Sequence, residues 1–134
     1  MTHTAVIGIK PGLESELLLQ LFRDLCPIPS IAHLVTFVQV GVEEDERSRF
    51  QRAELMLQEL GRSLLLAGHE IDLHVHLNVG SAGVQLAHLA GDLDASLLFL
   101  GLGKRTKVGK VLLGSDAQSA LLGAPCPVVS RRLD

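Results

Sequence analysis

The 134-residue sequence contains no Trp or Tyr, and aromatic residues make up only 3% of it. Surfaces that stack on nucleic-acid bases need such side chains, and the formal net charge of −3 gives no general attraction to phosphate backbones. The two cysteines, Cys26 and Cys126, lie far apart and form no disulfide framework. No apolar run approaches membrane-spanning length, and no basic segment followed by an apolar one opens the chain. We therefore expect a cytoplasmic protein that binds neither nucleic acid nor a membrane.

Hydrophobic residues make up 47% of the chain and charged residues 20%, which is typical of a folded protein. The length suits one domain, residues 1–134. Period-two and apolar runs predict strands, and period-3.6 runs predict helices. The expected strands cover 4–9, 31–40, 71–79, 96–100 and 127–131, and the expected helices 13–25, 43–67, 80–91 and 115–122. The helix over 80–91 has a weak pattern, and its apolar face is drawn through Val84 and Ala87. This alternation favours an α/β fold with a parallel sheet.

The stretch from 97 to 116 carries the strongest functional signal. A short apolar run ends on Gly101 and Gly103, a basic loop follows, and Gly114 and Ser115 open another apolar periodic segment. Glycine allows the backbone to approach a ligand closely, and Ser115 is a competent helix N-cap. The free N–H groups at a helix start favour phosphate. The stretch therefore predicts a site for a phosphate-bearing ligand.

Two familiar phosphate motifs do not fit this stretch. The dinucleotide fingerprint lacks its third glycine, because Thr106 stands there. The P-loop spacing is one residue too long between Gly103 and Gly109, and Val111 replaces the hydroxyl that would hold magnesium.

The same residues resemble the C-terminal third of the universal stress protein (UspA-like) family. The glycine pattern of that family is G-x-x-G-(nine residues)-G-[ST]; Gly101, Gly114 and Ser115 match it, whereas Lys104 replaces the second glycine. The ending Ala124-Pro125-Cys126-Pro127-Val128 also agrees. The resemblance implies a single three-layer αβα domain with a five-stranded parallel sheet of order 3-2-1-4-5, similar to the adenine nucleotide alpha hydrolase-like fold.

In that strand order the winding reverses between the first and fourth strands, where open α/β sheets bind ligands. The resemblance implies a bound adenine nucleotide (ATP, ADP or AMP), with or without Mg²⁺, and a stress-related regulatory or signalling role. Matching residue by residue, it implies that Ile9, Lys10 and Val38 line the adenosine side. Leu100 and Gly101 would border the ribose and α-phosphate, and the phosphates would meet Gly114, Ser115 and Asp116. The basic side chains Lys104 and Arg105 of the loop are the expected phosphate partners.

One departure leaves two alternatives open. Nucleotide-binding members of the family carry an aspartate where this sequence has Lys10, and a lysine cannot accept the hydrogen bonds of a carboxylate. Lys10 either reaches a phosphate, or it marks a member that has lost nucleotide binding and works as a dimeric interaction module. Lys104 in place of glycine is a second departure in the same sense.

No catalytic residue is predicted, and at most slow ATP hydrolysis is expected. Ser115 has the context of a helix cap rather than a nucleophile elbow, and no in-line base with metal carboxylates is recognisable. His74 and His76 lie two apart on one strand face and could chelate a metal. No Cys, Asp or Glu has a spacing that completes such a set, so two half-buried strand histidines and no metal site are expected.

We also expect a homodimer joined through the fifth strand, Pro127 to Arg131. In the implied order this strand is a sheet edge with an apolar centre at Val128 and Val129, and open apolar edges attract other strands. Relatives that it resembles pair this strand about a two-fold axis, which suits a closed dimer.

Overall fold

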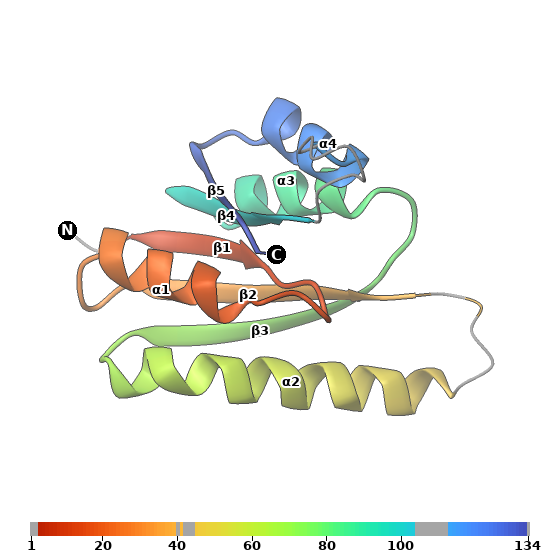
Figure 1. Ribbon diagram of the computed structural model, residues 1–134, viewed down its shortest axis with the longest axis horizontal. Coiled ribbons are helices and arrows are strands. Elements are labelled where there is room, and N and C mark those ends of the chain that lie inside the picture. The colour runs from red at the N-terminus through yellow and green to blue at the C-terminus, as the bar shows by residue number, and fades with distance from the viewer. Residues whose placement is uncertain (1–2, 40, 42–44, 104–112, 134) are drawn as a thin grey trace.

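The computed structural model describes residues 3–39, 41, 45–103 and 113–133 (Figure 1). Strands and helices alternate along the chain as the sequence pattern predicts. The strands are β1 (Thr4–Gly8), β2 (Ile31–Val38), β3 (Glu70–Leu77), β4 (Leu97–Leu102) and β5 (Val128–Arg132). The helices are α1 (Glu16–Leu25), α2 (Glu46–Leu66), α3 (Ala82–Asp92) and α4 (Ser115–Gly123). None of the helices in the described part of the chain is long and apolar enough to cross a membrane.

The five strands form one parallel sheet of order β3-β2-β1-β4-β5, which confirms the predicted fold class and strand order. β1 lies at the centre, between β2 and β4. Its residues and those of β2 are nearly continuously apolar because helices cover both faces of a parallel sheet at its centre. β5 is an edge strand, as expected, and β3 is the other edge.

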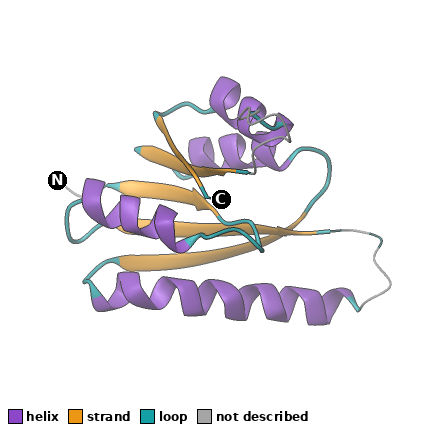
Figure 2. Ribbon diagram, viewed as in Figure 1, coloured by secondary structure: helices purple, strands orange, loops and turns teal. Residues whose placement is uncertain are grey.

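The helices form two outer layers (Figure 2). On one face, α1 and α2 bury Leu18, Phe22 and Leu57 against the central strands. On the other face, α3 and α4 bury Leu86 and Ala117 in a second core cluster. The chain therefore has the three-layer αβα arrangement that the resemblance implies.

The predicted α3 face was wrong in one position. Ala87 is buried, but Val84 is 43% exposed, and Gly83 takes part in the helix contact instead. A Cβ atom added to Gly83 would lie 1.9 Å from the backbone oxygen of Asp116, so α4 packs directly on this glycine. An apolar side-chain pattern does not report a contact made by the lack of a side chain.

The second helical layer covers the sheet unevenly. α3 packs on β1, β4 and α4, whereas the helix packed on β3 is α2, on the opposite face. Ile71, Leu73 and Val75 of β3 contact the α1–α2 core, so the alternate residues of β3 project to the other face. Those alternate residues are Asp72, His74 and His76. The sheet thus presents a polar surface beside the α3–α4 layer.

Most element ends differ from the predicted ends by one to three residues. β2 ends at Val38 rather than at residue 40, and β3 ends at Leu77, so Asn78 follows the strand. α1 begins at Glu16, after a turn in which the Ser15 amide donates to the oxygen of Leu13. These shifts matter at the carboxyl ends of β2 and β3, because side chains there face the cleft described next.

Candidate functional site

A cleft of about 600 Å³ opens at the carboxyl ends of the central strands. β1 and β4 are neighbours there although the chain leaves β1 in one direction and reaches β4 from the other, as at the predicted reversal point. The lining includes most of the residues predicted from the sequence. These are Ile9, Lys10, Leu100, Gly101, Gly114, Ser115 and Asp116.

Three predicted site residues are not among them. Val38 is buried and does not line the cleft, whereas its neighbours Phe37 and Gln39 do. Lys104 and Arg105 lie outside the described residues.

The inner wall of the cleft is apolar and rigidly held. Ile9 and Leu100 are both buried side chains at its base. The amide of Ile9 donates to the oxygen of Val35 at 2.7 Å, and the Thr36 hydroxyl donates to the oxygen of Ile9 at 2.8 Å. The segment after β1 is therefore fixed to β2, and the Thr36 hydroxyl is already used.

Lys10 stands at the rim of the cleft and is exposed. Its backbone oxygen accepts a hydrogen bond from the amide of Leu13. Its ammonium makes no hydrogen bond or ion pair with any residue that the structure describes. The charge is thus directed to solvent and to whatever occupies the cleft.

Asn78 is a cleft residue that the sequence reading counted as part of a strand. Its amide N–H donates to the oxygen of Val38 at 2.8 Å, and its side chain lines the cleft. The side-chain Oδ1 is buried and finds no hydrogen-bond partner within the described parts of the chain. Buried polar atoms are normally paired, so a free acceptor in a cleft is suited to a ligand donor. A polar residue at the end of a predicted strand was the feature of the sequence that could have indicated Asn78 as a cleft residue.

The start of α4 forms the outer wall. Gly114 is the N-cap, not Ser115 as predicted: the first intrahelical bond runs from the amide of Gln118 to the oxygen of Gly114 at 3.0 Å. A glycine cap has no side chain to accept a hydrogen bond, and none is made. By contrast, Ser81 caps α3 by accepting from the amide of Val84 at 3.3 Å. The first N–H groups of α4, on cleft-lining residues, therefore have no intrahelical acceptor.

The side chain of Asp116 joins the two helices. Its Oδ1 accepts from the Ser81 hydroxyl at 3.2 Å and from the amide of Gly83 at 3.3 Å. This carboxylate is thus held at the edge of the cleft, and it is the backbone of Asp116 that belongs to the helix start.

Gly101 and Gly114, which match the glycine pattern of the family, lack a side chain for different physical reasons. A Cβ on Gly101 would lie 2.2 Å from Cδ1 of Leu133, whose amide donates to the oxygen of Leu102 at 3.1 Å. The lack of a side chain at Gly101 therefore makes room for Leu133, which also lines the cleft. A Cβ on Gly114 would meet no described atom within 4 Å. Close approach to a ligand is thus left to Gly114.

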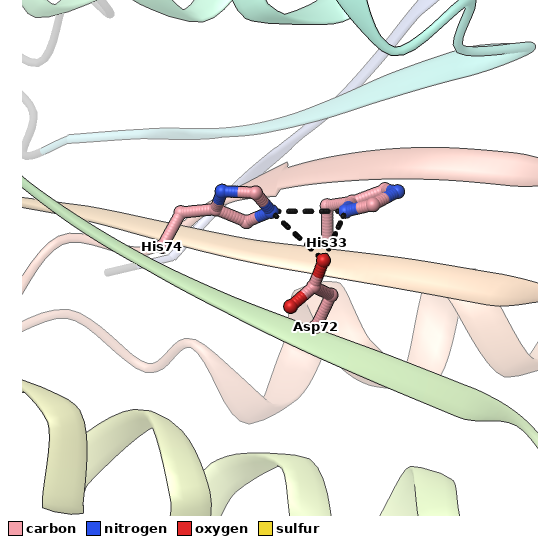
Figure 3. A group of neighbouring side chains, drawn as sticks. All are labelled: His33, Asp72 and His74. Atoms are coloured by element: carbon pink, nitrogen blue, oxygen red, sulfur yellow. Dashed lines mark hydrogen bonds and ion pairs between the residues drawn. The ribbon is translucent and has the colours of Figure 1, made fainter.

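A second group of polar side chains lies on the sheet face beside the α3–α4 layer (Figure 3). The ring nitrogens His33 Nδ1 and His74 Nε2 are 2.9 Å apart. Asp72 Oδ2 lies 3.6 Å from the first and 3.7 Å from the second. Burial lowers the pKa of both imidazoles; at His33 the charge of His74 lowers the pKa further, and Asp72 opposes the shift at both rings. The net shift at both rings favours the neutral imidazole.

This group corrects the histidine pair expected from the sequence. His74 and His76 stack with nearly parallel rings, 15° apart and 6.1 Å between centroids, so their nitrogens do not aim at one point. Asp72 does have a suitable spacing, two residues before His74, and His33 completes the group from β2. A strand periodicity could have indicated Asp72, but no pattern along the chain connects His33 to it.

Comparison with known proteins agrees with this architecture. The sequence profile of the universal stress protein family matches residues 29–130. A search of curated protein sequences found no match. A universal stress protein from Archaeoglobus fulgidus superposes with a TM-score of 0.74 at 18% identity, over 97% of this chain and 93% of that chain.

Two further solved structures are complexes with nucleotides. One is the universal stress protein from Archaeoglobus fulgidus in complex with dAMP, with a TM-score of 0.70, 18% identity and 96% coverage of both chains. The other is a universal stress protein in complex with cAMP, with a TM-score of 0.65, 17% identity, and coverage of 99% of this chain and 98% of that one. At these identities the structures establish a shared fold, whereas the profile covers most of the sequence. The chain belongs to the universal stress protein family.

Proposed function

We propose that this protein binds an adenine nucleotide in the cleft and acts as a nucleotide-dependent regulatory module in a stress response. The proposal rests chiefly on the start of α4, which no side chain in the described part of the protein caps and which lines a cleft of about 600 Å³ at the reversal point of the sheet. Small-molecule sites have volumes of roughly 300–1,000 Å³, so the cleft is large enough for a nucleotide.

The chemistry of the lining suits the parts of such a ligand. The apolar wall at Ile9 and Leu100 fits the base and the ribose edge. The unpaired Oδ1 of Asn78 is a hydrogen-bond acceptor, and the exocyclic amino group of adenine is a donor. The N–H groups at Ser115 and Asp116 and the Lys10 ammonium fit the phosphates.

Two relatives support the ligand class. The structures described above hold dAMP in one universal stress protein and cAMP in another. Both ligands are adenine nucleotides bound by proteins of the same fold. Which of ATP, ADP and AMP this chain prefers depends on how Lys10 and the loop after Gly103 meet the phosphates.

We propose binding without fast chemistry, with slow ATP hydrolysis as the upper limit. Asp116 is the one carboxylate among the described cleft residues, and Ser81 and Gly83 already hold it. A Mg²⁺ ion that enters with ATP would be held chiefly by phosphate oxygens and water, as is usual for this ion. A coupled assay should detect no turnover, or turnover far slower than the rates of ordinary ATPases.

The direct test is binding by the purified chain. Mass spectrometry of ligand released from the denatured protein should identify an adenine nucleotide, and calorimetry with ATP, ADP and AMP should give one site per chain. A protein that carries no nucleotide and takes up none of the three would contradict the proposal.

The edge strand β5 supports a second function, that of a dimeric interaction module, with or without a nucleotide. Val128 and Val129 are only partly buried within one chain, and Ser130 and Arg131 are exposed. We propose that two copies pair through β5, because a second copy would cover this apolar centre about a two-fold axis. Lys10, in place of the family aspartate, is the observation that favours a module without nucleotide.

Light scattering on a sizing column at micromolar concentration tests the dimer. The wild type should elute as a dimer, and Val129→Asp should shift it to the monomer by placing a charge in the contact. Val84→Asp is the matched control, since Val84 is exposed on α3. Because Val129 also packs against the core, circular dichroism should first show that the variant is folded. A monomeric wild type, or a folded Val129→Asp dimer, contradicts pairing through β5.

A further inference from the structure

The polar sheet face beside the α3–α4 layer holds a group of side chains that the nucleotide cleft does not use. His33 of β2 lies directly opposite Asp72 of β3, and His74 is the next residue of β3 on the same face. None of the three lines the cleft. Figure 3 shows the two ring nitrogens and the carboxylate turned toward one common space.

We propose that His33, Asp72 and His74 form a Zn²⁺ site. The three donor atoms are separated by 2.9, 3.6 and 3.7 Å. A circle through three points at these separations has a radius of about 2.0 Å, which matches the length of a Zn–N or Zn–O bond. The edge of a zinc tetrahedron with such bonds is about 3.3 Å, in the middle of the observed range. A metal ion therefore fits without a change of the strands.

The kinds of donor point to zinc among the common divalent ions. Two imidazoles and a carboxylate are zinc ligands, whereas Ca²⁺ and Mg²⁺ take oxygen atoms almost entirely. The side chain of Asp72 is 62% exposed, so the fourth coordination position opens to water.

The rigidity of the site is also favourable. The His33 and His74 side chains are 10% and 18% exposed, and their backbones are held in the regular pairing of β2 with β3. Ligands on strands lose little freedom when a metal binds. The competing explanation is a plain hydrogen bond between the two rings, in which a proton occupies the space that the metal would take. The two explanations differ in their response to added metal.

The test uses the full chain without a histidine tag, treated with a chelator and then titrated with CoCl₂ and ZnCl₂. One equivalent of Co²⁺ should give the intense visible absorption of a tetrahedral site, and Zn²⁺ should displace it. Asp72→Ala should weaken Zn²⁺ binding by more than about tenfold, because losing a ligand exceeds the ten- to hundredfold cost of losing an outer-shell partner. The exposure of Asp72 makes this variant safe for folding. His74→Ala should abolish the cobalt absorption.

His76→Ala is the matched control, since it removes the next histidine on the same face of β3 and should leave the affinity within about twofold. Zn²⁺ should also raise the thermal midpoint of the wild type and of His76→Ala, but not of Asp72→Ala. A wild type that binds no metal shows the hydrogen-bonded group alone and overturns the site. An Asp72→Ala variant that keeps the wild-type Zn²⁺ affinity, or a His76→Ala variant that loses it, overturns this set of ligands.

Discussion

The two candidate sites of this protein are built in opposite ways. The cleft is formed where secondary-structure elements begin or end: by the residues after β1, the last residues of β4 and the start of α4. Its described residues offer backbone N–H groups, the Lys10 ammonium and the amide oxygen of Asn78, which has no hydrogen-bond partner among them. The group of His33, Asp72 and His74, called the histidine group below, lies within two paired strands and offers only side-chain donors.

The difference has a physical cause. Parallel strands leave unpaired backbone groups at their ends and pair them in between, so a site at the ends can use the backbone and a site within the sheet cannot. A diffuse anionic ligand suits the first, and a compact cation suits the second. The comparison makes four predictions.

Gly114→Val should block the cleft without harming the fold. A Cβ atom at this position meets no described atom within 4 Å, so we expect the thermal midpoint of the free protein to stay close to that of the wild type. Forcing a branched side chain into a ligand contact costs about 1–3 kcal/mol. Calorimetry should therefore give an ATP affinity reduced by up to about a hundredfold. Leu122→Val, at the exposed far end of the same helix, is the control. Equal ATP affinity in wild type and Gly114→Val would remove the start of α4 from the site.

Lys10→Asp should show how much of the binding free energy comes from the phosphates and how much from the adenosine part of the ligand. A hydrogen bond to a charged group contributes about 1.5–3 kcal/mol, so the loss of this ammonium should weaken ATP by about tenfold or more and leave adenosine nearly unchanged. Lys10→Met shows how much of the loss comes from removing the positive charge and how much from adding a negative one. If Lys10→Asp improves both ligands, Lys10 marks a site that has lost the family's nucleotide contact.

Asn78→Leu should weaken ATP by about fivefold, which corresponds to one hydrogen bond of about 1 kcal/mol. The free protein should be as stable as the wild type or more stable, because an unpaired buried oxygen is removed. Gln39→Leu, an exposed position on the same rim, should leave ATP affinity unchanged. A drop in stability with unchanged ATP affinity would assign Asn78 to the fold alone.

Asp72→Ala should leave ATP affinity within about twofold when the titration is done in zinc-free buffer with Mg²⁺. Asp72 lies away from the cleft lining, and its charge is exposed to screening solvent. Conversely, Lys10→Asp should leave Zn²⁺ affinity unchanged. A strong effect of Asp72→Ala on ATP affinity, or of Lys10→Asp on Zn²⁺ affinity, would mean that the two sites are coupled although they lie apart on the sheet.

The sequence predicted the cleft far better than the histidine group. Gly101, Gly114 and Ser115 are close to each other along the chain and have a spacing that can be recognised, so seeing the fold was not needed to choose them. His33 and Asp72 are neighbours through the pairing of β2 with β3, and that pairing has no signature in either segment alone. The sequence indicated His74 and His76 as a possible pair and passed over Asp72, which the structure places with His33 and His74.

Errors within the cleft have the same origin. Val38 was predicted at the adenosine side, yet it is buried, and its neighbours Phe37 and Gln39 line the cleft instead. Ser115 looks like a cap, but the first intrahelical bond begins at Gly114. Each error is a shift of one residue, which changes the direction of a side chain completely while leaving the element in place.

From the sequence came the element order, the α/β class and, through the family resemblance, the strand order and most of the residues that line the cleft. Apolar periodicity and the glycine spacing are local properties of the chain, so they can be recognised without knowing how the elements pack together. Tertiary structure alone decided that Leu133 fills the space at Gly101, that Asp116 joins α4 to α3, and that Asn78 keeps an unpaired oxygen. It also decided that His33 meets Asp72 and His74. These contacts join segments far apart in sequence, and only the packing of the sheet and its helices brings such segments within a few ångströms.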